Sequence, residues 1–136
     1  MATKKKDYNA MEKDNEAFEK HKFNFVKNAL RISTYKWPYF SIALAKSRLD
    51  RGLYQCASCK GTFGPKEINR DHIEPVIAVT GFTTWTDYIN RLFVKSDAIQ
   101  IICIQCHETK SMVENEMRRK NGQKPLRTKK RKKSKK

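Results

Sequence analysis

Four cysteines in two C-x-x-C pairs carry the clearest chemical signal in this chain of 136 residues. Cys56 and Cys59 form the first pair, and Cys103 and Cys106 form the second. A two-residue gap lets a tight turn aim both sulfurs at one ion, so the spacing predicts a structural zinc ion held by four thiolates. Two disulfides or a redox-active pair are the alternatives. Because the chain opens with no apolar signal segment and lacks thioredoxin-like flanks, we expect a reducing cytosol and free thiolates.

An Asp-His dipeptide and a further histidine lie within or beside this cysteine frame. Asp71 and His72 fall between the two pairs, and His107 directly follows Cys106. A histidine with an ordinary pKa of about 6.5 can act as a base near neutral pH. Asp71 and His72 could instead form a structural pair, and His107 could replace a cysteine as zinc ligand. Since four sulfurs already complete a tetrahedron, we expect His107 to serve elsewhere.

The rest of the sequence predicts the elements that must position these residues. A chain of this length has room for one domain, and a metal would add to the stability of its core. Apolar periodicity, Pro38 and the N-cap candidate Thr84 indicate the helices, while a short strand or hairpin should carry Asp71 and His72. Helices are expected over residues 11–32, 38–49 and 84–93 and from about residue 105 to Gly122.

Positive charge is concentrated at the C-terminus. Residues 118–136 contain 12 Lys or Arg and no Asp or Glu, out of a net charge of +16. Without apolar spacing this tail should be disordered when free and should bind nucleic acid by releasing counterions. A merely solubilising tail, an expression artefact and an anionic membrane surface are weaker alternatives, and no membrane partner is expected. The candidate nucleic-acid contacts are Lys110, Arg127, Lys129, Lys130, Arg131, Lys132 and Lys133.

These observations predict four segments along the chain. Residues 1–9 form a flexible basic arm, residues 10–52 a helical extension, residues 53–120 a zinc-stabilised core, and residues 121–136 a polybasic tail. Lys110 lies on the final helix of the core, where it either contacts phosphate or faces water.

Two motifs together resemble the HNH endonucleases: Asp71-His72-Ile73-Glu74-Pro75, and the run from Cys103 to Lys110. The similarity is to the zinc-containing phage type, whose pattern is C-x-x-C, D-H-I-x-P, then C-x-x-C-H-x-x-K, and it covers about residues 28–117. The resemblance implies a small ββα-metal core (HNH, His-Me finger), in which a hairpin with the Asp-His pair packs against a helix with the last histidine. With the helical extension and the tail, the expected fold class is α+β.

The resemblance also implies roles for three residues. His72 would be the general base, while Asp71 and His107 would hold one divalent ion: Mg²⁺, Mn²⁺, Ni²⁺ or Zn²⁺. That ion would bind the scissile phosphate and stabilise the leaving 3′ oxygen. The implied activity is phosphodiester hydrolysis in duplex DNA, by nicking or double-strand cleavage. Such an enzyme would serve a phage in genome packaging, homing or degradation of competing DNA in the host cytosol.

One position departs from the family pattern. An asparagine usually stands five residues before the third cysteine, where this chain has Ala98. Asp97 and Asn90 are the nearest substitutes, and backbone hydrogen bonds could brace the hairpin loop instead. The alternative function is a non-catalytic, zinc-stabilised module that binds nucleic acid.

Overall fold

A computed structural model describes residues 6–127, which divide into two compact units at Lys36 and Trp37. Helices and short antiparallel strands give the α+β class that the sequence predicted. None of the helices described is long and apolar enough to cross a membrane.

The first unit contains two helices where the sequence predicted one continuous helix over residues 11–32, and that prediction is wrong. Helices α1 (Tyr8–Lys13) and α2 (Asn15–Ser33) are separated by Asp14, which is extended, with φ −108° and ψ 107°. Its carboxylate accepts hydrogen bonds from the backbone N–H groups of Glu16 and Ala17 at 3.0 and 3.3 Å. An N-cap of this kind starts a new helix because it satisfies first-turn donors.

Helix α1 also begins within the stretch expected to be a loose arm. Asp7 caps it by accepting a hydrogen bond from the backbone N–H of Ala10 at 3.1 Å. After α2, a 3₁₀ turn, η1 (Thr34–Lys36), ends the unit.

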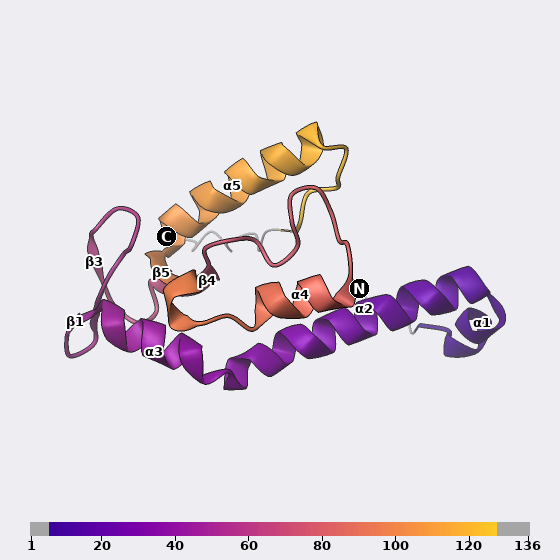
Figure 1. Ribbon diagram of the computed structural model, residues 1–136, viewed down its shortest axis with the longest axis horizontal. Helices are drawn as coiled ribbons and strands as arrows, with labels where there is room; N and C mark the ends of the chain where they lie inside the picture. The colour runs from indigo at the N-terminus through magenta and orange to yellow at the C-terminus, as the bar shows by residue number, and fades with distance from the viewer. Residues whose placement is uncertain (1–5, 128–136) are drawn as a thin grey trace, which may run out of the picture. The chain divides into compact units, whose positions relative to one another are not determined.

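The second unit holds two small antiparallel sheets and three helices (Figure 1). The elements are α3 (Pro38–Ser47), β1 (Arg48–Asp50), β2 (Leu53–Gln55), β3 (Thr62–Phe63), β4 (Ile68–His72), α4 (Trp85–Leu92), η2 (Ser96–Ala98), β5 (Ile99–Cys103) and α5 (Ile104–Lys120). Strands β1, β2 and β3 form one sheet in that order, and β4 pairs with β5 in the other.

Helix α3 is shorter than predicted because the chain turns into a hairpin. It ends at Ser47, and residues 48–50 pair with β2. Gly52 has φ +68°, a conformation that favours glycine, so it makes the hairpin turn and does not end a helix.

Strands β4 and β5 set the register of the Asp-His pair. Asp71 lies opposite Gln100, and His72 lies opposite Ile99. Figure 1 shows this pair of strands between α3 and α5. Because successive side chains on a strand point to opposite faces, Asp71 and His72 are directed to different sides of the sheet.

The helix predicted after Thr84 is confirmed. Thr84 caps α4 by accepting a hydrogen bond from the backbone N–H of Asp87 at 3.1 Å. Tyr88 and Leu92 of α4 are 2% and 1% exposed and belong to the core, whereas Ile89 is 41% exposed. A second buried group, Phe40, Ala43 and Ile99, joins α3 to β5.

Candidate functional site

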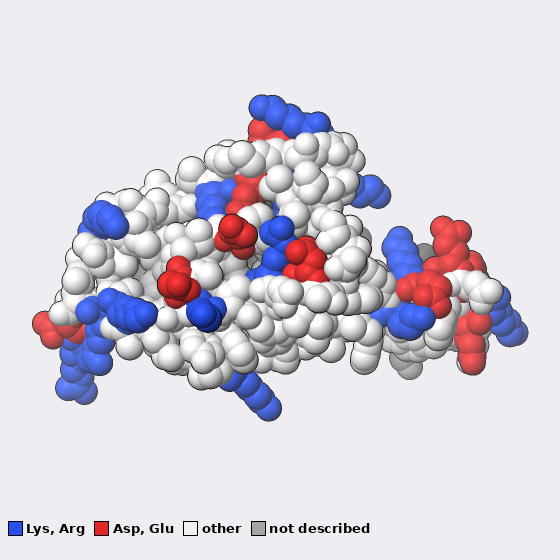
Figure 2. Space-filling view, in the orientation of Figure 1, with Lys and Arg blue, Asp and Glu red and all other residues white. Residues whose placement is uncertain are grey.

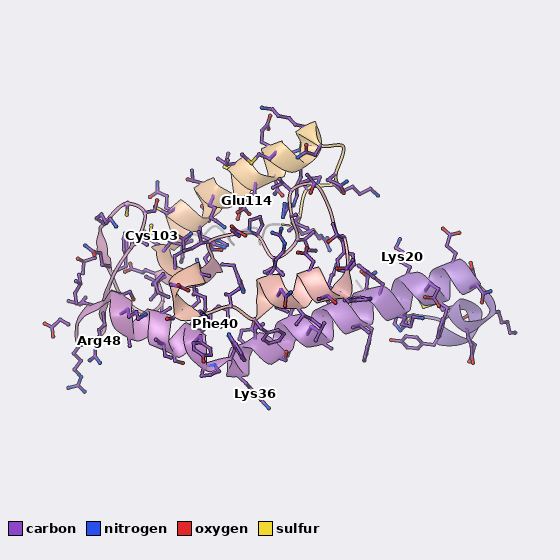
Figure 3. All side chains as sticks on the ribbon, in the orientation of Figure 1. Lys20, Lys36, Phe40, Arg48, Cys103 and Glu114 are labelled. Carbon is purple, nitrogen blue, oxygen red and sulfur yellow. The ribbon has the colours of Figure 1, made fainter. Side chains whose placement is uncertain are left out.

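The four cysteines come from two structurally different turns. Cys56 and Cys59 lie in the turn between β2 and β3, where Lys60 donates its backbone N–H to the carbonyl of Cys56 at 3.0 Å. Cys103 ends β5 and caps α5, which places Cys106 in the first turn of that helix (Figure 3). Two hydrogen bonds from backbone N–H groups connect the two turns. Cys103 N–H donates to Cys56 Sγ at 3.3 Å, and Ala57 N–H donates to the carbonyl of Ile101 at 2.8 Å.

The sulfur positions suit a tetrahedral metal ion. All four Sγ atoms lie within 4.8 Å of one another. With zinc-sulfur bonds of about 2.3 Å, tetrahedral sulfurs lie roughly 3.8 Å apart. The four cysteines can therefore hold a structural metal such as zinc.

The thiol pKa values show why a cation would stabilise this cluster. Burial raises the pKa of Cys56, but backbone N–H groups of Cys103, Cys59 and Ser58 outweigh it and lower that pKa to about 6. A hydrogen bond with the Cys103 side chain, followed by burial, raises the pKa of Cys106 to about 12. One sulfur is thus a ready thiolate while another resists ionisation beside it. A divalent cation would supply the charge that lets all four ionise.

Asp71 is the centre of a second polar cluster, between β4, β5 and α5. Its side chain is 13% exposed. Its Oδ2 accepts a hydrogen bond from Gln100 Nε2 at 2.9 Å and forms an ion pair with Lys110 Nζ at 3.0 Å. Both donors act on the same oxygen. The other oxygen, Oδ1, lies 3.6 Å from His107 Nε2.

Lys110 belongs to this cluster, and its side chain is 22% exposed. Its ammonium donates to three acceptors: Asp71 Oδ2 at 3.0 Å, Glu114 Oε1 at 2.6 Å and the carbonyl of His72 at 3.0 Å. Burial lowers the pKa of Lys110, but the carboxylates of Glu114 and Asp71 outweigh it, so the pKa is raised. Lys110 is therefore a cation fixed inside the site.

His72 lies on the opposite face of β4. Its Nε2 is 2.8 Å from the carbonyl oxygen of Leu92, and its ring meets the Phe40 ring edge-on with centroids 5.3 Å apart. A carbonyl can only accept, so Nε2 carries the proton in this contact. In the neutral imidazole, Nδ1 is then the basic nitrogen.

Backbone hydrogen bonds brace the loop at Ala98, where the family pattern has asparagine. The Ala98 carbonyl accepts from Ile73 N–H at 3.0 Å, and Ala98 N–H donates to the carbonyl of Lys95 at 3.1 Å. Asn90 and Asp97, the substitutes considered from the sequence, line one cavity of about 400 Å³ together with His72.

A second cavity, of about 610 Å³, opens beside the Asp71 cluster. Lys110 and Glu114 line it on one side, with apolar side chains of the loop after β4 and of α5 around them. Glu74 and Arg91 line both cavities, so they form the boundary between the His72 side and the Lys110 side.

The candidate residues of the tail are only partly described. Arg127 is exposed and follows Leu126, which exchanges two hydrogen bonds with the Asn115 side chain of α5, at 2.9 and 3.1 Å. Five of the predicted nucleic-acid contacts lie outside the described residues, namely Lys129, Lys130, Arg131, Lys132 and Lys133.

Sequence reasoning missed Gln100 and Glu114 as members of the site. The spacing of Lys110 and Glu114 was visible as an i, i+4 pair on a helix, but Gln100 could be found only from the strand register. Comparison of the chain with protein-family models, with curated proteins and with solved structures gives no match.

Proposed function

We propose that this chain is a metal-dependent DNA endonuclease of the HNH type, with a ββα-metal core formed by β4, β5 and α5. The observation that carries the proposal is the 3.6 Å separation of Asp71 Oδ1 and His107 Nε2. Two ligand atoms about 2.1 Å from a shared ion lie roughly 3.0 to 4.2 Å apart. The pair thus fits one divalent ion, while zinc in the four-cysteine cluster would hold the fold.

Each residue of the site has a defined task in this account. Gln100 and Lys110 hold Asp71 Oδ2, which keeps Oδ1 directed at His107. When bound, the divalent ion would supply positive charge to a phosphodiester oxygen and to the departing oxygen. His72, held through Nε2 by Leu92, would accept the proton of the attacking water at Nδ1.

A metal-dependent plasmid assay tests this proposal. The zinc-loaded chain should convert supercoiled plasmid to relaxed or linear DNA when Mg²⁺, Mn²⁺ or Ni²⁺ is added. Asp71→Asn should need a higher metal concentration or lose activity, because it replaces a carboxylate ligand by a weaker amide. Supercoiled plasmid that stays intact with every metal, in a chain that is folded, would contradict the proposal.

A second candidate function is a zinc-stabilised module that binds nucleic acid without cutting it. Lys110 favours it, because its ammonium already neutralises Asp71 and Glu114 and would oppose a cation at that place. Both functions predict salt-sensitive DNA binding. Metal binding separates them, since only the endonuclease predicts that Asp71→Asn weakens the binding of added Mn²⁺ while the zinc content stays unchanged.

A further inference from the structure

Some cations of the second unit pair with carboxylates on α4 and α5: Arg91 pairs with Asp87 at 3.0 Å, Lys110 pairs as described above, and Arg119 lies 3.8 Å from Glu116. Three other cations lie close together along the chain at the junction of α3, β1 and β2. Within residues 6–127, no ion pair involves Lys46, Arg48 or Arg51.

The side chains of Lys46 and Arg48 donate hydrogen bonds to neutral groups. Lys46 Nζ donates to Ser96 Oγ at 2.9 Å, and Arg48 Nε donates to the backbone carbonyl of Asp50 at 3.2 Å. The nearby carboxylate of Asp50 accepts from the backbone N–H of Arg51 at 2.7 Å. We call Lys46, Arg48 and Arg51 the hairpin surface. Figure 2 shows Lys and Arg side chains projecting at the β1 end of this unit, and Arg48 is labelled there in Figure 3.

Two apolar side chains of the same hairpin are also exposed to solvent. Leu49 is 56% exposed and Leu53 is 41% exposed, on either side of the turn at Gly52. The hairpin forms the β1 edge of a three-stranded antiparallel sheet, and cations along this edge can reach the phosphates of duplex DNA.

The hairpin is firmly attached to the elements of the site. Strand β2 leads directly into Cys56, whose sulfur accepts the backbone N–H of Cys103. Helix α3, which leads into β1, places its Phe40 ring against His72. A phosphate held by the hairpin would therefore be fixed relative to His72 and to the first turn of α5.

We propose that the hairpin surface binds backbone phosphates of duplex DNA and thereby positions the duplex beside Asp71 and His72. This inference rests on the proposed function, because it assigns the surface that presents the substrate to that site. Each phosphate neutralised by a cation releases condensed counterions, so the contribution of each residue appears in the salt dependence of binding.

The test is fluorescence anisotropy of a labelled DNA duplex with the full zinc-loaded chain, without added divalent ions, over a series of salt concentrations. A plot of log affinity against log salt concentration has a negative slope, and the double variant Arg48→Gln/Arg51→Gln should make that slope shallower by about 1.8. At about 100 mM salt its affinity should fall on the order of 10-fold to 100-fold. Both arginines are exposed, so far-ultraviolet circular dichroism and zinc content should match those of the native chain.

The matched control is Arg119→Gln/Lys120→Gln, which removes the same formal charge from the end of α5. It should change the slope by less than half as much. If the hairpin variant keeps the native slope, or if the two double variants change it equally, the hairpin surface is not the binding surface. A native chain that cuts plasmid while the hairpin variant keeps the native slope would overturn this inference alone. A native chain that binds no duplex would overturn the proposed function as well.

Discussion

Replacing Lys110 with methionine should destabilise the protein by about 2 kcal/mol at neutral pH. The ammonium makes three short contacts, two of them with carboxylates, and its side chain is only 22% exposed. Hydrogen bonds to charged groups contribute about 1.5–3 kcal/mol each. The variant no longer buries the ammonium charge of Lys110, and the desolvation energy it saves offsets part of the stability lost with the hydrogen bonds. Methionine keeps most of the aliphatic stem, so the change reports mainly on the charge.

The pH dependence of this effect follows from the raised pKa of Lys110. A lysine whose pKa is raised on folding contributes stability that is fully present below its unfolded pKa of about 10.4. The contribution is lost as the pH rises through the folded value. The difference between the native chain and Lys110→Met should therefore be constant between about pH 7 and pH 9 and shrink only above the unfolded pKa.

Urea denaturation of the zinc-loaded chains at several pH values measures this difference. Arg119→Met is the control. The side chains of Arg119 and Glu116 are 59% and 62% exposed, and their charged groups lie 3.8 Å apart. Exposed pairs of this kind contribute about 0 to 1 kcal/mol. A loss for Lys110→Met no larger than that of Arg119→Met, or a difference that falls away between pH 7 and pH 9, would refute the placement of Lys110 inside the site.

Three further predictions concern the frame around the site. Gly61→Ala should destabilise the protein by about 1–3 kcal/mol, because the new Cβ would lie 2.9 Å from the Phe63 ring. At Gly64 the nearest atom is 3.6 Å away, so Gly64→Ala should leave the stability nearly unchanged. Thermal unfolding of the two variants compares these effects. Cys59→Ser should lose bound zinc, measured by atomic absorption, together with cooperative unfolding; a variant with full zinc content would contradict the four-sulfur site. Phe40→Ala should cost about 3–5 kcal/mol in urea denaturation, since the ring is 6% exposed; a cost below 1 kcal/mol, about one buried methylene, would contradict the packing of α3 on β5.

Local signals in the sequence predicted several elements of this fold. The C-x-x-C spacing predicted the sulfur cluster because two-residue turns fix both sulfurs locally. Thr84 predicted the start of α4 because an N-cap acts within one turn. Within each C-x-x-C pair and at Thr84, the residues that determine the structure lie within a few positions of it, whereas the two pairs meet across a separation of 47 residues.

The features that the sequence did not reveal depend on competition between alternative local conformations or on partners far away in the sequence. Asp14 could have been an exposed helical residue, and only its cap geometry shows the break between α1 and α2. The β1–β2 hairpin replaced the last turn of a helix because residues 48–50 found a strand partner in β2. The position of Gln100 beside Asp71 depends on the register of two strands joined by a 26-residue connection, which no local pattern determines.

The most direct test of the central claim is the rate at which supercoiled plasmid is cut in Mn²⁺ by the native chain, His72→Ala and His21→Ala. His21 lies on α2 in the first unit, where its ring meets those of Tyr8 and Phe25, so it is a matched histidine outside the proposed site. If His72 is the general base, His72→Ala should cut at least 100-fold more slowly while it keeps its zinc and its fold. His21→Ala should cut at the native rate. Full activity of His72→Ala would contradict its role as general base, and no cutting by the native chain would contradict the endonuclease function.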